Sequence, residues 1–215
     1  NAINLQGSNH VLFGGINFGG QIENMFGTNT LTGSITTSFN AAISARAGST
    51  LNLNGTWGLG TMTLAFTGNG TINLGTNFSG SIWGIEKHGQ GTVNLTAANS
   101  AVFSNLFTLN GGTFALSGSG TLAGGATLAG SLQAGATLAV NDTGTAIANR
   151  LGSGRPLTIQ HGIFDFTANG VSNSSQTFGA LTVGAGAATL KISNTGSAQS
   201  LLTFSSLASN VVANQ

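Results

Sequence analysis

Four short segments decide the fold of this chain: Thr50-Leu51-Asn52-Leu53, Thr71-Ile72-Asn73-Leu74, Thr92-Val93-Asn94-Leu95 and Thr113-Phe114-Ala115-Leu116. Their first residues are evenly spaced along the chain. Apolar and polar residues alternate within each segment, which is typical of a β-strand with one buried face. A fixed period that contains one such strand in every repeat is the signature of a repeat fold.

The period, about 21 residues, suits one full turn of a β-solenoid. It is too short for a helical-hairpin repeat and too long for a single hairpin strand. Successive coils would stack at about 4.8 Å, the spacing of hydrogen-bonded strands, so equivalent residues of neighbouring coils would touch. We therefore predict an all-β fold, a parallel β-helix with about 21 residues per coil.

Stacking of this kind predicts columns of equivalent side chains. Two inward columns would form the structural core: Leu51, Ile72, Val93 and Phe114, and beside them Leu53, Leu74, Leu95 and Leu116. One outward column would consist of Asn52, Asn73 and Asn94, with Ala115 in the following coil. Two interpretations of the Asn column stay open. The side chains either hydrogen-bond to one another as a ladder, or Asn simply tolerates solvent beside a turn.

The composition favours β-structure and excludes several functions. Hydrophobic residues make up 40% of the chain and charged residues only 4%, against a usual charged share of about 25%. No apolar run approaches the ~20 residues of a membrane-spanning helix, so we expect no transmembrane segment. A net charge of +1, without a run of basic residues, argues against binding to nucleic acid. The absence of Cys excludes disulfides and thiolate metal sites.

The pattern divides the chain into four parts. They are irregular N-terminal coils or a cap (1–49), regular coils (50–140), an irregular coil that contains a loop (141–170) and C-terminal coils (171–215). The period already lengthens between Thr113 and Thr137. Because the chain begins at Asn1 without Met, we expect it to be a processed piece of a longer precursor.

Aromatic residues are the expected anchors of the core, because they dominate buried apolar area. In the first part these anchors are Phe13, Phe18, Phe26 and Phe39. In the regular coils, Trp57 and Trp83 either cover the core at a corner or form an outward patch, and core packing is the favoured interpretation. Glu23 and Arg46 are isolated charges, expected to form at most a weak surface pair.

One stretch resembles a known repeat family. It is Glu86-Lys87-His88-Gly89-Gln90-Gly91-Thr92-Val93-Asn94-Leu95-Thr96-Ala97-Ala98-Asn99, followed by Leu109-Asn110-Gly111-Gly112-Thr113-Phe114. This is similar to the autotransporter-associated β-strand repeat, Lys-x-Gly-x-Gly-Thr-Leu-x-Leu-x-Gly-x-Asn and then a Gly-Gly-Thr-Leu strand. His88 and Ala98 depart from that pattern. The resemblance implies a right-handed β-helix passenger that is displayed outside a bacterial cell.

The remaining charges provide the only stretch in which a catalytic site can be imagined. They are Asp142, Arg150, Arg155, His161 and Asp165. Glycan-cleaving enzymes on solenoids use clustered acids, or acids with Arg or Lys, in a groove. These five share no strand period, so we expect an irregular loop over 143–156 with its Arg side chains on the surface. We predict no catalytic, cofactor or metal residues, since His10, His88 and His161 also lie far apart.

These features favour a non-enzymatic extracellular structural or adhesive solenoid. A solenoid with blunt ends exposes unpaired backbone groups, so we expect copies to assemble end to end, or by strand donation, into a filament. Surface glycans are a further expected partner. The alternative function is a carbohydrate- or ice-binding module that uses the column of Thr50, Thr71, Thr92 and Thr113. A polysaccharide-degrading enzyme is the least favoured hypothesis.

Overall fold

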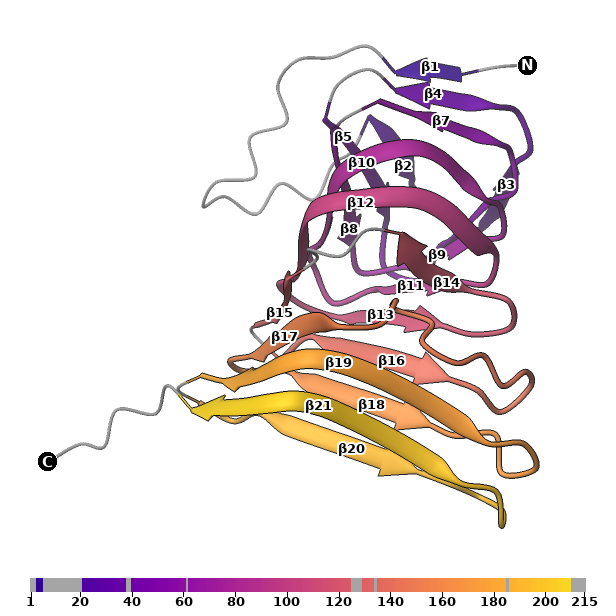
Figure 1. Cartoon of the computed structure of the whole chain (residues 1–215). Helices are drawn as coiled ribbons and strands as arrows, with labels where there is room; N and C mark the ends of the chain where they lie inside the picture. The colour runs from indigo at the N-terminus through magenta and orange to yellow at the C-terminus, as the bar shows by residue number, and fades with distance from the viewer. Residues whose placement is uncertain are drawn as a thin grey trace, which may run out of the picture.

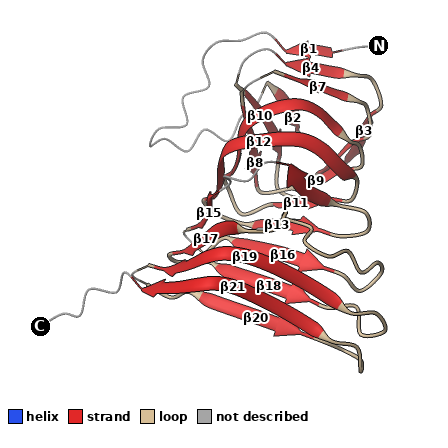
Figure 2. Cartoon of the chain, in the orientation of Figure 1, coloured by secondary structure: helices blue, strands red, loops and turns tan. Residues whose placement is uncertain are grey.

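The protein is a continuous β-solenoid of parallel strands (Figure 1). The computed structural model describes residues 3–5, 21–37, 40–60, 62–124, 129–133, 135–184 and 186–209. All regular secondary structure within these ranges is β-strand, and they contain no helix (Figure 2). Each strand pairs in parallel with the equivalent strands of the neighbouring coils. The predicted all-β solenoid fold is therefore confirmed.

Two sheets form the walls of the solenoid. The eight-stranded sheet comprises β3 (Thr28–Leu31), β6 (Thr50–Leu53), β9 (Thr71–Leu74), β11 (Thr92–Leu95), β13 (Thr113–Leu116), β16 (Thr137–Asn141), β18 (Ile163–Thr167) and β20 (Thr189–Ser193). The main path of the thirteen-stranded sheet comprises β1 (Ile3–Leu5), β4 (Ile35–Thr37), β7 (Trp57–Leu59), β10 (Phe78–Lys87), β12 (Ala98–Leu109), β15 (Ala129–Leu132), β17 (Arg155–Ile159), β19 (Ser174–Val183) and β21 (Ser200–Ser209). Its side branches are β2 (Ile22–Asn24), β5 (Ala41–Ala45), β8 (Thr63–Gly68) and β14 (Thr121–Gly124).

The number of strands in each coil falls along the axis, from three in the first coils (β4, β5 and β6, for example) to two in the last (β19 and β20). The long strand β10 bends round a corner, because its first half pairs with β7 and its second half with β8. Strand β12 has the same curved course (Figure 1). Towards the C-terminus the long strands β19 and β21 lie opposite β18 and β20, and Phe164 of β18 meets Phe178 of β19 edge to face at 5.3 Å. The last coils therefore form a two-layered slab.

The period follows the sequence where the repeats are regular and lengthens afterwards. Strands of the eight-stranded sheet start at equal steps from Thr50 to Thr113, and the step to Thr137 is longer. The last two steps, to Ile163 and to Thr189, are longer again and equal to each other. An irregular loop over 142–154 accommodates part of the added length, close to the loop expected over 143–156.

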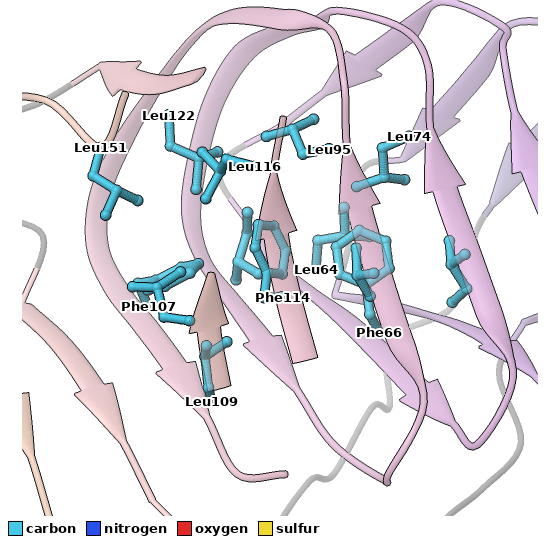
Figure 3. Packing of buried hydrophobic residues seen from close by; sticks show 14 of the residues in the cluster. Leu64, Phe66, Leu74, Leu95, Phe107, Leu109, Phe114, Leu116, Leu122 and Leu151 are labelled. Atoms are coloured by element: carbon cyan, nitrogen blue, oxygen red, sulfur yellow. The ribbon is translucent and has the colours of Figure 1, made fainter. Parts of the chain in front are cut away.

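The inward residues of the four regular strands stack in the expected order. Parallel register places Leu51, Ile72, Val93 and Phe114 in one column and Leu53, Leu74, Leu95 and Leu116 in the next. All eight side chains are at most 3% exposed. Figure 3 shows Leu74, Leu95 and Leu116 following one another along the core, with Phe114 beside Phe107. One continuous apolar core therefore joins the coils.

Close contact between coils at the corners depends on glycine. A Cβ atom built on Gly91 would lie 2.2 Å from the carbonyl oxygen of Gly70 in the preceding coil. Heavy atoms do not approach so closely, so any larger residue would push the two coils apart at this corner. The Gly-x-Gly segment before Thr92 is thus a structural requirement of the stacking.

The aromatic residues depart from the expected pattern in part. Trp57 is fully buried and meets Phe78 edge to face at 5.3 Å, whereas Trp83 is 47% exposed. Phe26 is 79% exposed, so its expected role as a core anchor is wrong. The reason is its position in the turn between β2 and β3, where the side chain points away from the core walls. Phe13, Phe18 and Phe39 lie outside the described residues.

Candidate functional site

The loop over 142–154 contains a buried ion pair. Nε of Arg150 donates to Oδ1 of Asp142, and both side chains are fully buried. Nη1 of Arg150 donates to the carbonyl of Gly120 at 2.8 Å, and Nη2 donates to the carbonyl of Thr145 at 2.5 Å. The expected surface position of Arg150 is therefore wrong. Its guanidinium ties the loop to the preceding coil, because it bonds to Gly120 of that coil as well as to Asp142 and Thr145 of the loop itself.

The other charges of this part of the chain point elsewhere. Arg155 is only 2% exposed, also against expectation, and burial lowers its pKa to about 10. Asp165 lies on the outer face of β18 and accepts a 2.8 Å hydrogen bond from Nζ of Lys191, whose side chain is exposed. His161 is exposed at a corner. Asp142 is therefore buried against Arg150, whereas Asp165 lies on the outer face against Lys191. The five charges do not line one groove.

Lys87, in the stretch that resembles the autotransporter-associated repeat, is a buried cation. Its register partners are Phe66 and Leu109, so it occupies a core column and is only 1% exposed. Its Nζ donates to the carbonyls of His88 at 2.8 Å and Gly89 at 2.9 Å. Burial lowers the pKa of Lys87 from 10.5 to about 8. Its neighbours turn outward, where Nε2 of His88 lies 3.1 Å from Oε2 of Glu86.

The outer face of the eight-stranded sheet carries a ladder of side-chain amides. Nδ2 of Asn94 donates to Oδ1 of Asn73 at 2.8 Å, and Nδ2 of Asn73 donates to Oδ1 of Asn52 at 2.7 Å. The ladder ends on the hydroxyl of Thr30, to which Nδ2 of Asn52 donates at 3.2 Å. Of the two interpretations left open by the sequence, the hydrogen-bonded ladder is the one present. At its other end the ladder stops at Asn94, because Ala115 of the next coil has no hydrogen-bonding side chain.

A column of threonines runs beside the amide ladder. Register places six of them one above another: Thr28, Thr50, Thr71, Thr92, Thr113 and Thr137. Ile163 interrupts the column and Thr189 resumes it in the last strand. From β3 to β16 the two columns make an uncharged, hydroxyl- and amide-rich face, and beyond it the amide column continues as the ion pair of Asp165 and Lys191.

The C-terminal end of the described solenoid exposes its core. Leu190 and Ile192 of β20 continue the columns of Phe164 and Phe166, yet they are 43% and 49% exposed. On β21, Leu207 continues the column of Leu181 and is 72% exposed. We define the open end as Leu190, Ile192, Leu202, Phe204 and Leu207. It is the cross-section of an apolar core on which no further described coil lies.

Both strands of this end are also edges of their sheets. Within the described residues β20 pairs only with β18, and β21 pairs only with β19 (Figure 1). An edge strand presents a row of backbone N–H and C=O groups that can pair with another chain. The open end thus combines apolar side chains with an unsatisfied hydrogen-bonding edge, which is the chemistry that another β-coil recognises.

The opposite end of the eight-stranded sheet is more polar. Strand β3 is its other edge, and Asn29 occupies the inward column above Leu51. Nδ2 of Asn29 donates to Oδ1 of Asn24 at 2.6 Å and to the carbonyl of Phe26 at 2.9 Å. The side-chain amide nitrogen of Asn29 is therefore hydrogen-bonded within the chain. At the start of the same strand, Thr28 belongs to the threonine column.

Comparisons and searches of the described residues add no further assignment. The chain matches no protein-family model, no curated protein and no solved structure. In the described ranges no three His, Asp or Glu side chains come close enough to hold a metal ion. No helix of the described residues has the length and hydropathy needed to cross a membrane. The resemblance to the autotransporter-associated repeat stays a prediction.

Proposed function

We propose that this chain is a non-enzymatic structural β-solenoid that assembles end to end into a filament. We propose further that it works outside a bacterial cell, as its resemblance to autotransporter passengers implies. The observation that carries the assembly is the open end, where Leu190, Ile192 and Leu207 prolong core columns and no other described strand covers them. Burial of one such side chain contributes about 1.5–3 kcal/mol, so covering the open end favours association.

The chemistry of the two ends favours head-to-tail addition. Strand β3 of a second copy laid on β20 in parallel would set Thr28 against Thr189, Leu31 against Ile192 and Thr30 against Lys191. The threonine column and one apolar column would then run on across the junction. Asn29 would meet Leu190, and this is tolerable because the amide nitrogen of Asn29 is already hydrogen-bonded.

Tail-to-tail pairing is less favourable on the same grounds. Two β20 strands paired antiparallel about their centres would bring Lys191 against Lys191 of the second copy. Like charges directly opposite each other in a sheet are destabilising. A symmetric pairing would also close on itself as a dimer, whereas a head-to-tail contact repeats without limit.

The experiment compares two lysine substitutions in the full chain. Leu207→Lys places a charge on the open end, where the side chain is 72% exposed and so contributes little to the folded monomer. Val171→Lys adds the same charge at a residue that is 90% exposed in the turn between β18 and β19. Light scattering and negative-stain electron microscopy over a concentration series measure assembly, and circular dichroism verifies the fold.

We expect wild type and Val171→Lys to form filaments and Leu207→Lys to remain monomeric. One buried charge at the contact should raise the critical concentration about 100-fold or more, since an unpaired charge is costly to desolvate. Wild-type protein that stays monomeric at high concentration would refute the proposal. Filaments of Leu207→Lys that form as readily as those of wild type would show that the open end is not the contact.

A second candidate function is ordering of water or ice on the outer face of the eight-stranded sheet. Six consecutive threonines in register favour it, because they set hydroxyl groups at the regular spacing of stacked strands. The neighbouring amide column argues against it, since Asn94 donates to Asn73, Asn73 to Asn52 and Asn52 to Thr30, so these donors are already used within the protein. A thermal-hysteresis assay of wild type and Thr92→Val decides: no hysteresis in wild type rejects this candidate.

A further inference from the structure

A hollow lies on a corner of the first coils, remote in sequence from the open end. Its volume is about 440 Å³, within the range of small-molecule sites. Three successive corners line it: the turn from β2 to β3 with Met25 and Phe26, the turn from β5 to β6 with Ala47, and the end of β8 at Gly68 with Asn69 of the following turn. The hollow exists because the second and third corners carry small residues beneath a projecting aromatic ring.

The floor of the hollow is fixed by backbone geometry. Gly68 has a φ of +88°, and a Cβ there would lie 2.2 Å from the carbonyl oxygen of Ala45. A side chain is therefore excluded at position 68. Asn69 is held in place because its Oδ1 accepts a 2.8 Å hydrogen bond from the backbone N–H of Gln90. The floor therefore consists of closely packed backbone at Gly68 and the hydrogen-bonded amide of Asn69.

One wall is polar and electrically balanced. Nε of Arg46 donates to Oε1 of Glu23 at 2.8 Å, and the two side chains are 54% and 23% exposed. The pair is weak as a source of stability because it is exposed to solvent. Among the described residues, this contact uses one carboxylate oxygen of Glu23 and one nitrogen of Arg46. Within the part of the chain that the structure describes, the second oxygen of Glu23 and the two terminal nitrogens of Arg46 make no other hydrogen bond, so they can accept and donate at the hollow.

The other wall is apolar. Phe26 is 79% exposed and Met25 is 37% exposed, side by side at the rim. A large aromatic side chain so far out of the core gains nothing for the fold, and exposed apolar groups gathered around a hollow are typical of binding sites. A hollow lined by both an aromatic ring and a paired acceptor and donor is suited to a ligand with one apolar face and adjacent hydroxyl groups.

We propose that this corner hollow binds a neutral hexose unit of a polysaccharide. The C–H face of the sugar ring packs on Phe26, one hydroxyl donates to Glu23 and its neighbour accepts from Arg46. A neutral sugar fits better than an acidic one, because Glu23 and Arg46 already balance each other and a further carboxylate would face Glu23. The site would give the solenoid adhesion to glycan surfaces, separately from its assembly.

Calorimetric titration of the whole chain with three neutral oligosaccharides, cellohexaose, mannohexaose and chitohexaose, tests this proposal, with hexagalacturonate as the acidic comparison. Phe26→Ala removes the apolar wall, and Ala47→Trp fills the hollow without deleting a polar group. Trp83→Ala is the matched control, because it removes an exposed aromatic side chain outside the hollow. Each variant is first verified to unfold at the same denaturant concentration as wild type.

We expect at least one neutral oligosaccharide to bind wild type and Trp83→Ala equally. Phe26→Ala should weaken binding about 10-fold to 100-fold, the loss that corresponds to one uncovered aromatic side chain. Ala47→Trp should abolish binding. The proposal is overturned if no neutral oligosaccharide binds wild type, if hexagalacturonate alone binds, or if Trp83→Ala loses as much affinity as Phe26→Ala. The outcome is independent of filament formation, because Leu207→Lys leaves the hollow intact.

Discussion

The buried ammonium of Lys87 gives a quantitative prediction about stability and pH. Lys87 lies in a core column between Phe66 and Leu109, and its Nζ reaches the carbonyls of the adjoining corner. These carbonyls do not restore full hydration, so the pKa of the folded state falls to about 8 from 10.5. The folded protein therefore releases this proton at a lower pH than the unfolded chain does.

The sign and size follow from linkage. Between the two pKa values the unfolded chain binds more protons than the folded protein, so the free energy of unfolding rises with pH. From about pH 7 to about pH 9.5 a shift of this size adds about 2 kcal/mol. The contribution is absent below the folded pKa, where both states are protonated. Arg155, with a pKa of about 10, adds a similar rise only at higher pH.

Denaturant unfolding of wild type and Lys87→Met at a series of pH values measures this effect. The chain has no Tyr and no Cys, so few other side chains titrate in the window. Protein is kept dilute to prevent assembly, and the fluorescence of buried Trp57, one coil from Lys87, is compared with circular dichroism. The difference between the two proteins cancels the contributions of all the groups that they share.

Wild type should gain about 2 kcal/mol over this range while Lys87→Met stays flat. Equal slopes in the two proteins would show that the buried amine is not the titrating group. A wild-type stability that falls between pH 7 and about pH 9.5 would contradict the sign of the argument itself.

Three further substitutions test the stacking. Asn73→Ala removes two hydrogen bonds of the ladder and should lower the free energy of denaturant unfolding by about 1–2 kcal/mol, about twice the loss in Asn94→Ala, which removes one. Equal losses would show that the ladder does not contribute to stability. Arg150→Met leaves the buried Asp142 without its ion-pair partner and should lower the free energy of unfolding by about 3–5 kcal/mol. Adding Asp142→Asn should restore part of this stability, and no recovery would rule out the ion pair as the cause. Gly91→Ala should cost at least about 2 kcal/mol, whereas Gly144→Ala, where a Cβ meets open space, should be neutral in the same thermal melt.

The regular coils could be predicted from the sequence because two patterns agree there. The repeat period gives the length of one coil, and the alternation of apolar and polar residues shows which side of each strand faces the core. The Thr-x-Asn-Leu segments repeat at the length of one coil, and each inward residue needs only an apolar neighbour above and below it. The register survives further along the chain, where Ile163-Phe164-Asp165-Phe166 pairs with the strand at Thr137. The sequence no longer reveals it there, because the residue types have changed and the coil has become longer.

Other features depend on contacts that no local pattern encodes. Burial of Arg150 requires the loop to fold back on Gly120, which lies 30 residues earlier in the chain. Phe26 was expected in the core from its residue type, yet its place in a turn exposes it. The burial of Lys87 could have been predicted, because it follows the inward Ile85 by two positions on the same strand and so points to the same side. The open end requires knowledge of where stacking stops, which only the three-dimensional arrangement provides.

Head-to-tail continuation of the solenoid is tested most directly by cross-linking across the expected junction. In Thr28→Cys/Thr189→Cys, the chain's only two cysteines would meet between copies at about 4.8 Å, within the Cα separation of a disulfide. Mild oxidation should then give a ladder of covalent multimers on a non-reducing gel, and neither single variant should give more than traces of dimer. Complete dimerisation of Thr189→Cys alone, with no higher rungs in the double variant, would contradict the head-to-tail filament.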